Sequence, residues 1–163
     1  AGAIGRQIGR ILGGYECDVT IISRSQPPTL ADLDDLLPQA DVVLAALPET
    51  EETVGIFTAS RLAAMKPTAV FVNVGRGSAV DEPALIEALQ SGRLAGAVLD
   101  VTAEEPLPTN SPLWRLPNVL LTQHTAGGYA DEQADKVPVF LQNLRRFRAG
   151  EEVENRVDFG KGY

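Results

Sequence analysis

Cysteine and histidine are scarce in this 163-residue sequence, which contains one of each, Cys17 and His124. A single cysteine cannot form an internal disulfide, which is typical of a reducing compartment, so we expect a cytoplasmic protein. A Cys/His metal cluster or a Cys–His nucleophile pair would need both residues, and their spacing indicates neither. We therefore expect no metal site.

Long hydrophobic runs and an excess of basic residues are also lacking. The longest apolar stretches, such as residues 42–47 and 70–72, fall far short of the roughly 20 residues that a transmembrane helix needs. The opening AGAIGRQIGR lacks the order of a secretory signal. With 14 basic and 22 acidic residues the net charge is −8, which disfavours binding to a nucleic acid backbone. Neither a membrane nor a nucleic acid is an expected partner.

Short β-rich runs alternate with helical segments from residue 15 to residue 124. The runs show little alternation of polar and apolar residues, which is typical of buried parallel strands. This order predicts an α/β fold, a doubly wound parallel sheet of the Rossmann type, with ligands at the carboxyl ends of the strands. A long helix follows from about residue 130 to 149. The expected strands are 19–22, 41–47, 69–74, 97–99 and 119–122, and the expected helices between them are 30–37, 59–65 and 82–90.

The first five residues, AGAIG, lead directly into an amphipathic helix that carries Ile4, Ile8 and Ile11 on one face. They match the second half of the dinucleotide fingerprint GxGxxG. In it, Gly2 lets the backbone approach a pyrophosphate, Gly5 lets the helix pack on the sheet, and the helix N-terminus supplies amide donors. The alternative is a plain glycine-rich turn.

The first glycine and first strand of that fingerprint would precede residue 1. We therefore expect a dinucleotide-binding domain over residues 1–128 that is truncated before its central first strand, followed by a C-terminal helix and tail over 129–163. Such a piece is not expected to fold well in isolation.

The expected strand 19–22 is the second strand of the fold, because the first would precede residue 1. It is followed by Ser23-Arg24-Ser25, which contains no acid. A carboxylate at this place binds the ribose 2′-hydroxyl of NAD and repels a 2′-phosphate, whereas a hydroxyl beside a guanidinium can bind that phosphate. The sequence therefore favours NADP, with NAD as second choice. The alternative is that Arg24 is an ordinary solvated loop residue.

Two later strand ends carry charged groups that suit carbonyl chemistry. Arg76 lies between Gly75 and Gly77, where its guanidinium can grip a carboxylate; a helix-terminus salt bridge is the alternative. His124 ends the last expected strand, and Glu105 follows the expected strand before it. A carboxylate bonded to one imidazole nitrogen fixes the tautomer, so the other nitrogen can deliver a proton. Arginine, carboxylate and histidine over one dinucleotide site suit the reduction of a carbonyl.

Three motifs, which carry Arg76, Glu105 and His124, occur in one order: they lie in the segment VNVGRGSAVDEPALIEALQSGRLAGAVLDVTAEEPLP and in TQHTAGG, which follows it. Together they closely resemble the D-isomer-specific 2-hydroxyacid dehydrogenases, a family that includes glyoxylate/hydroxypyruvate reductases. The resemblance runs from Ala1 to about Phe147. Arg76 and Glu105 lie 29 residues apart and Glu105 and His124 lie 19 apart, as in the family.

The resemblance implies roles for individual residues. Arg76 would hold the substrate carboxylate and polarise its keto oxygen, His124 would be the general acid in reduction, and Glu105 would be its partner. The SRS form resembles the NADP-using reductases of the family. Further contacts to the cofactor would come from Ala3, Ile4, Leu47, Pro48, Thr53, Val74, Gly75, Asp100 and Gly127.

The leading hypothesis is therefore the nucleotide-binding part of an NADP-linked oxidoreductase acting on a small 2-keto or 2-hydroxy acid, with glyoxylate or hydroxypyruvate as candidates. The alternative is a non-catalytic dinucleotide sensor or corepressor on the same fold. The resemblance also implies a homodimer, and a substrate-binding domain to which residues 129–163 would return. Whether the isolated chain is active, and on which acid, does not follow from the sequence.

Overall fold

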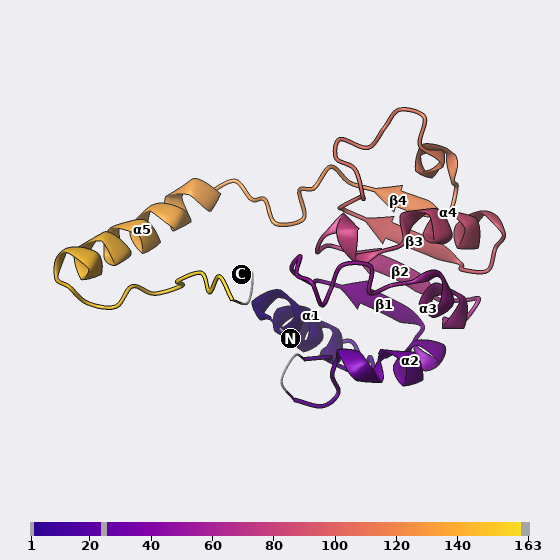
Figure 1. The fold of residues 1–163 in the computed structure, drawn as a ribbon, viewed down its shortest axis with the longest axis horizontal. Coiled ribbons are helices and arrows are strands. Elements are labelled where there is room, and N and C mark those ends of the chain that lie inside the picture. The colour runs from indigo at the N-terminus through magenta and orange to yellow at the C-terminus, as the bar shows by residue number, and fades with distance from the viewer. Residues whose placement is uncertain (1, 24–25, 161–163) are drawn as a thin grey trace.

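The computed structural model describes residues 2–23 and 26–160, which form a parallel sheet with helices and a separate C-terminal helix (Figure 1). The sheet order is β1-β2-β3-β4, and every neighbouring pair is parallel. Each connection is therefore a crossover, and the predicted Rossmann-type α/β architecture is confirmed. The strands of the described residues are β1 Val42–Ala45, β2 Val70–Asn73, β3 Gly96–Leu99 and β4 Val119–Leu121.

Two of the helices, α3 and α4, begin at a polar side chain that satisfies one of the first free amides. Thr58 accepts a hydrogen bond from the Arg61 amide at the start of α3, and Asp81 accepts one from Ala84 at the start of α4. Helix α4 confirms the predicted bounds, residues 82–90. The α-helices in the described residues are α1 Ala3–Gly13, α2 Leu33–Leu36, α3 Ala59–Ala64, α4 Glu82–Gln90 and α5 Glu132–Arg148.

The helix predicted over 30–37 is divided into three short pieces. A capping box between Thr29 and Asp32 starts a 3₁₀ turn, Leu30–Asp32, before α2 begins. A second 3₁₀ turn, Leu37–Gln39, contains Pro38, which lacks the amide hydrogen that would continue the α-helical ladder of α2. Leu33 and Leu37 are nonetheless buried, as their helical spacing predicted.

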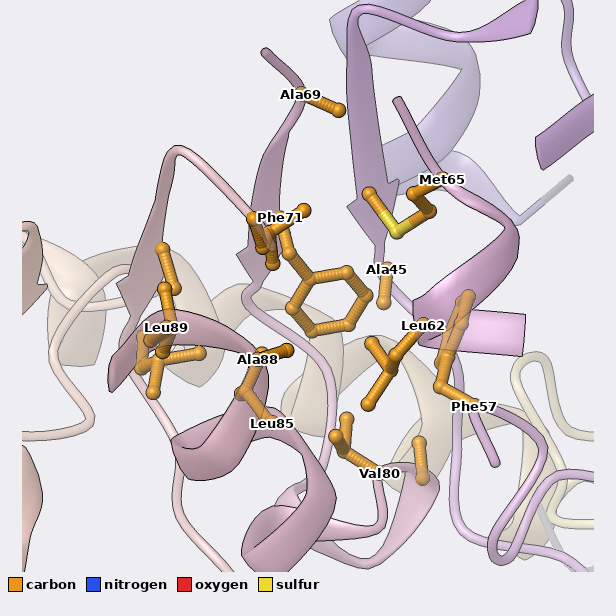
Figure 2. Packing of buried hydrophobic residues seen from close by; sticks show 14 of the residues in the cluster. Ala45, Phe57, Leu62, Met65, Ala69, Phe71, Val80, Leu85, Ala88 and Leu89 are labelled. Atoms are coloured by element: carbon orange, nitrogen blue, oxygen red, sulfur yellow. The ribbon is translucent and has the colours of Figure 1, made fainter. Parts of the chain in front are cut away.

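The core packs α3 and α4 against the sheet around Phe71 of β2 (Figure 2). Phe71 is fully buried and meets the ring of Phe57 edge-on at a centroid distance of 4.9 Å. Leu62 from α3 and Leu85 from α4 are each 1% exposed. Burying a side chain of this size contributes roughly 1.5–3 kcal/mol, so this one layer fixes the sheet that positions the strand ends.

The strand predicted over residues 19–22 is wrong. This segment has no regular secondary structure and pairs with none of the described strands. It packs on α1 instead: the side chain of Ile21 lies so close to Gly9 that a Cβ there would meet it at 2.5 Å. A β-strand is defined by its ladder of backbone hydrogen bonds, and an apolar sequence cannot supply the neighbour that the ladder needs.

The predicted long C-terminal helix is confirmed as α5, but its apolar side does not pack on the sheet. Val137, Phe140 and Phe147 are all exposed, and none of the residues of α5 is buried. Figure 1 shows α5 standing apart from the sheet at the end of an extended connection. Within the described part of the chain, no helix is long and apolar enough to cross a membrane.

Candidate active site

The loops that follow β1, β2 and β3 are packed backbone to backbone around Arg76. A Cβ on Gly75 would lie 2.6 Å from the backbone of Leu47, after β1. On Gly77 it would lie 1.8 Å from the carbonyl oxygen of Thr102, after β3. The two glycines beside Arg76 are therefore needed so that its loop fits between the neighbouring loops.

Two side chains hold the Arg76 loop in shape. The buried amide of Asn73 accepts a hydrogen bond from the Gly75 amide at 3.0 Å and donates one to the Arg76 carbonyl at 3.0 Å. Ser78 donates to the carboxylate of Glu49, after β1, at 2.6 Å. Arg76 itself is exposed, and its Nη1 donates to the Gly75 carbonyl at 2.7 Å. The guanidinium thus stands on a rigid loop with donors left for a ligand.

The structure brings Glu105 and His124 together. A hydrogen bond of 2.7 Å joins Oε2 of Glu105 to Nδ1 of His124, whose side chain is 48% exposed. The Thr102 amide donates to the other carboxylate oxygen of Glu105 at 3.1 Å. The bond to His124 is the main cause that lowers the pKa of Glu105, with the charge of Arg76 adding to it. Arg76, Glu105 and His124 therefore lie in one electrostatic neighbourhood.

Asp100, which ends β3, is 5% exposed and accepts hydrogen bonds from the loop that carries His124. Its partners are the Thr122 hydroxyl, the Thr125 amide at 2.9 Å and the Ala126 amide at 3.0 Å. Burial opposes ionisation, but these hydrogen bonds outweigh it and lower the pKa of Asp100. The carboxylate is thus ionised at neutral pH although it is buried.

The start of α1 fits the phosphates of a dinucleotide. The first bond of the helix ladder runs from the Arg6 amide to the Gly2 carbonyl, so the amides of Ala3, Ile4 and Gly5 precede the ladder. No side chain caps this end, and no atom lies within 4 Å of a Cβ built on Gly2. Figure 1 shows this end of α1 on the side to which the strands point. Free amides, open space and the helix dipole are what a pyrophosphate requires.

The loop after β1 contains the predicted contacts Leu47, Pro48 and Thr53. Thr53 is buried, and its hydroxyl donates to the Pro48 carbonyl at 2.6 Å and accepts from the Thr50 amide at 2.9 Å. Its polar atom is therefore used within the loop, which it shapes. Val74 continues the backbone from β2 and donates its amide to the Ala45 carbonyl. Gly127 has open space where a Cβ would stand.

Ser23 closes a short turn, because its hydroxyl donates to the Gln26 carbonyl at 2.7 Å and accepts from the Gln26 amide at 2.9 Å. Its single hydroxyl proton is thereby used within the turn. The predicted contacts Arg24 and Ser25 lie outside the described residues.

Sequence reasoning missed the residues that shape these loops, chiefly Asn73, Thr122 and Glu82. Glu82, at the start of α4, accepts a hydrogen bond from the Ala103 amide at 2.8 Å and so anchors the loop that leads to Glu105. Asn73 and Thr122 carry a usable signal, since each is a polar residue directly at the end of an apolar strand. Glu82 carries none, because an acid in the first turn of a helix is ordinary.

Known proteins are similar to this chain in both sequence and fold. The family model for the NAD binding domain of D-isomer specific 2-hydroxyacid dehydrogenases matches residues 1–126. A glyoxylate/hydroxypyruvate reductase B from Citrobacter koseri is 45% identical over 127 residues, which are 78% of this chain and 39% of that protein. The chain spans about half, or less, of the length of its curated relatives.

Two solved structures superpose on nearly the whole chain. A D-isomer specific 2-hydroxyacid dehydrogenase from Xanthobacter autotrophicus Py2, in complex with NADPH and MES, is 41% identical with a TM-score of 0.92, over 99% of this chain and 69% of that one. An NADPH-dependent glyoxylate/hydroxypyruvate reductase from Sinorhizobium meliloti, in complex with NADP and sulfate, is 35% identical with a TM-score of 0.91, over 99% of this chain and 54% of that one. The chain therefore belongs to the D-isomer specific 2-hydroxyacid dehydrogenase family.

Proposed function

We propose that this chain binds NADP(H) at the carboxyl edge of its sheet and supplies the catalytic groups for reduction of a small 2-keto acid to the D-2-hydroxy acid. The observation that carries the proposal is the hydrogen-bonded pair of His124 and Glu105, with Arg76 close enough to lower the pKa of Glu105. One anion-binding group and one oriented acid are what a keto acid needs, because it presents a carboxylate beside a carbonyl.

Each of the three side chains has a distinct task in this reaction. Arg76 binds the carboxylate of the keto acid and places its positive charge near the keto oxygen, where negative charge develops. Glu105 holds Nδ1 of His124, which leaves Nε2 to hand a proton to that oxygen. The carboxylate of Glu105 also stabilises the imidazolium before the proton leaves. The dinucleotide, when bound, supplies the hydride that reaches the carbonyl carbon.

The preference for NADP rests on the charge of the segment Ser23-Arg24-Ser25. Ser23 stands where an acid would repel a 2′-phosphate, and Arg24 follows it with a positive charge. The Xanthobacter relative was solved with NADPH and the Sinorhizobium relative with NADP. A charge-assisted hydrogen bond contributes about 1.5–3 kcal/mol, so we expect NADPH to be preferred to NADH by roughly 10- to 150-fold. Glyoxylate and hydroxypyruvate are the first substrates to test, because the Citrobacter and Sinorhizobium relatives carry these names.

The wider organisation of the protein is also a proposal. Residues 1–128 would be the dinucleotide-binding domain without its first strand, and 129–163 a helix and tail that pack on a substrate domain. The exposed apolar side chains of α5 support the second part, since they are free to be covered. A location in the cytoplasm agrees with the exposed free thiol of Cys17. A homodimer is proposed as well and is tested by sedimentation of the purified protein.

The experiment has a binding arm and a turnover arm. We expect NADPH to bind more tightly than NADH in a calorimetric titration, and glyoxylate or hydroxypyruvate to cause NADPH oxidation. Binding without oxidation by any 2-keto acid would support a sensor on the same fold instead. Failure to bind either dinucleotide would contradict the proposal as a whole.

A further inference from the structure

The geometry points to Asp100 as a positioning residue for His124: its carboxylate holds the chain on both sides of the histidine and so sets the direction of the imidazole. This deepens the proposed function, because His124 is the proposed proton donor there.

The hydrogen bonds of Asp100 straddle His124. The Thr122 hydroxyl, two residues before the histidine, donates to Oδ1 of Asp100. The amides of Thr125 and Ala126, one and two residues after it, donate to Oδ1 at 2.9 Å and to Oδ2 at 3.0 Å. One carboxylate at the end of β3 therefore fixes the two ends of a turn whose centre is His124.

This turn needs to be held, because His124 has a left-handed backbone conformation, with φ of +57°. A residue with a Cβ adopts that region at a cost in free energy, so an unrestrained loop would leave it. The sheet ladder does not restrain it, since the last backbone bond into β4 is from the Thr122 amide to the Leu99 carbonyl. Beyond that point, the bonds from Asp100 replace the ladder.

The held conformation places the imidazole of His124 beside Glu105. In this conformation Nδ1 lies 2.7 Å from Oε2 of Glu105, although both side chains are partly exposed. Two exposed groups pair weakly when their loops are free, because ordering them costs conformational entropy. A buried carboxylate that has already ordered one loop removes much of that cost. The buried Asp100 and the exposed Glu105 thus have separate tasks, one on the backbone and one on the ring.

Both carboxylate oxygens are required for this task. Asp100→Asn keeps the size of the side chain but replaces one acceptor oxygen with an amide group that donates. At least one of the two backbone amides then faces a donor or loses its partner, which is unfavourable at a site that is 5% exposed. The substitution therefore removes the positioning while changing the volume of the core very little.

The imidazole tautomer gives a direct readout, because His124 is the one histidine in the sequence and its side-chain ¹⁵N signals need no further assignment. In mildly alkaline solution we expect the wild-type chain to hold the proton on Nδ1, which donates to Glu105. We expect Asp100→Asn to shift the population to the Nε2–H tautomer that free histidine prefers in water. Asp34→Asn is the matched control: it breaks the exposed pair with Arg61, whose Nε lies 2.7 Å from Asp34, and leaves the tautomer unchanged.

The outcomes separate positioning from other roles. Retention of the Nδ1–H tautomer in folded Asp100→Asn overturns the inference, as does a wild-type chain with mainly Nε2–H. Weakened NADPH binding with an unchanged tautomer would make Asp100 a cofactor contact instead. If Asp100→Asn does not fold, Thr122→Val decides: we expect a partial shift that Thr122→Ser does not show, and no shift overturns the inference. The tautomer is read without any substrate, so failure of keto acid reduction would count against the proposed function alone.

Discussion

Arg76 is exposed but stands on a loop that its neighbours make rigid, and that combination suits a residue that binds a small anion. Arg76→Lys keeps the positive charge and loses the two-pronged geometry of the guanidinium. We expect the KM for glyoxylate to rise by roughly 10- to 150-fold, from the loss of a charge-assisted hydrogen bond of about 1.5–3 kcal/mol, while the Kd of NADPH stays unchanged. Steady-state kinetics and a binding titration measure the two. Loss of NADPH affinity with an unchanged KM would place Arg76 in the cofactor site.

Asp100 makes the stability of the fold sensitive to acid. Its pKa is lower in the folded chain than its ordinary value, so its ionisation stabilises the fold fully above the unfolded pKa of about 4. That contribution is lost as the pH falls through the lower folded-state pKa. We expect the Tm of wild type to fall more steeply than that of Asp100→Asn between neutral pH and about pH 3. If the Tm values of the two proteins fell equally with pH, the Asp100 carboxylate would not be stabilised by its hydrogen-bond partners.

The sequence predicts the site for some of its residues and not for others. His124, Glu105 and Arg76 were predicted from their places at strand ends, and the structure brings them together because parallel strands end at one edge. The burial of Thr53 was not predictable. Its hydroxyl turns inward to four atoms of its own loop, and nothing in LPETEET distinguishes an inward threonine from an outward one.

At the scale of elements, the glycines beside Arg76 lock three loops together. Gly77→Ala places a Cβ 1.8 Å from the Thr102 carbonyl oxygen, which is backbone and cannot rotate away. We expect this substitution to destabilise the chain by about 1–3 kcal/mol, as overpacking does. Urea denaturation measures the change.

Gly13→Ala is the control for that substitution. No atom beyond the chain neighbours and the helix's own backbone lies within 4 Å of the added Cβ at the end of α1, so we expect no loss of stability and a gain of up to about 1 kcal/mol. Equal effects of the two substitutions would mean that the loops after β2 and β3 are not packed as described.

The elements differ in how well the sequence predicts them, and the reason is whether their partners are local. Helix α4 was predicted to the residue, because its cap Asp81 and its proline lie within its own sequence. The segment 19–22 was predicted as a strand from its apolar residues, but strand formation depends on a neighbour elsewhere. The split of residues 30–37 into 3₁₀ and α turns depends on the capping box between Thr29 and Asp32 at its start and on Pro38 just beyond its end.

The whole molecule consists of a packed sheet region and a C-terminal helix that adds nothing to its core. Between residue 129 and residue 160, where the described chain ends, none belongs to the hydrophobic cluster, and α5 buries none of its side chains. We expect removal of residues 129–163 to leave the Tm of the sheet region unchanged within a few degrees. The far-UV circular dichroism signal that is lost with these residues should be smaller than the signal of a fully formed 17-residue helix. Unpacked helices of about this length are marginally stable in water. Loss of cooperative unfolding in the shortened chain would show that α5 supports the sheet.

The central claim is that the carboxyl edge of the sheet is a reducing site in which His124 delivers the proton. It is tested most directly by the rate of NADPH oxidation on addition of glyoxylate or hydroxypyruvate, compared between wild type and His124→Gln at saturating NADPH. We expect the substitution to lower kcat by roughly 10²- to 10⁴-fold, the usual loss for a general acid, with NADPH still bound. Equal rates in the two proteins would contradict the assignment of His124.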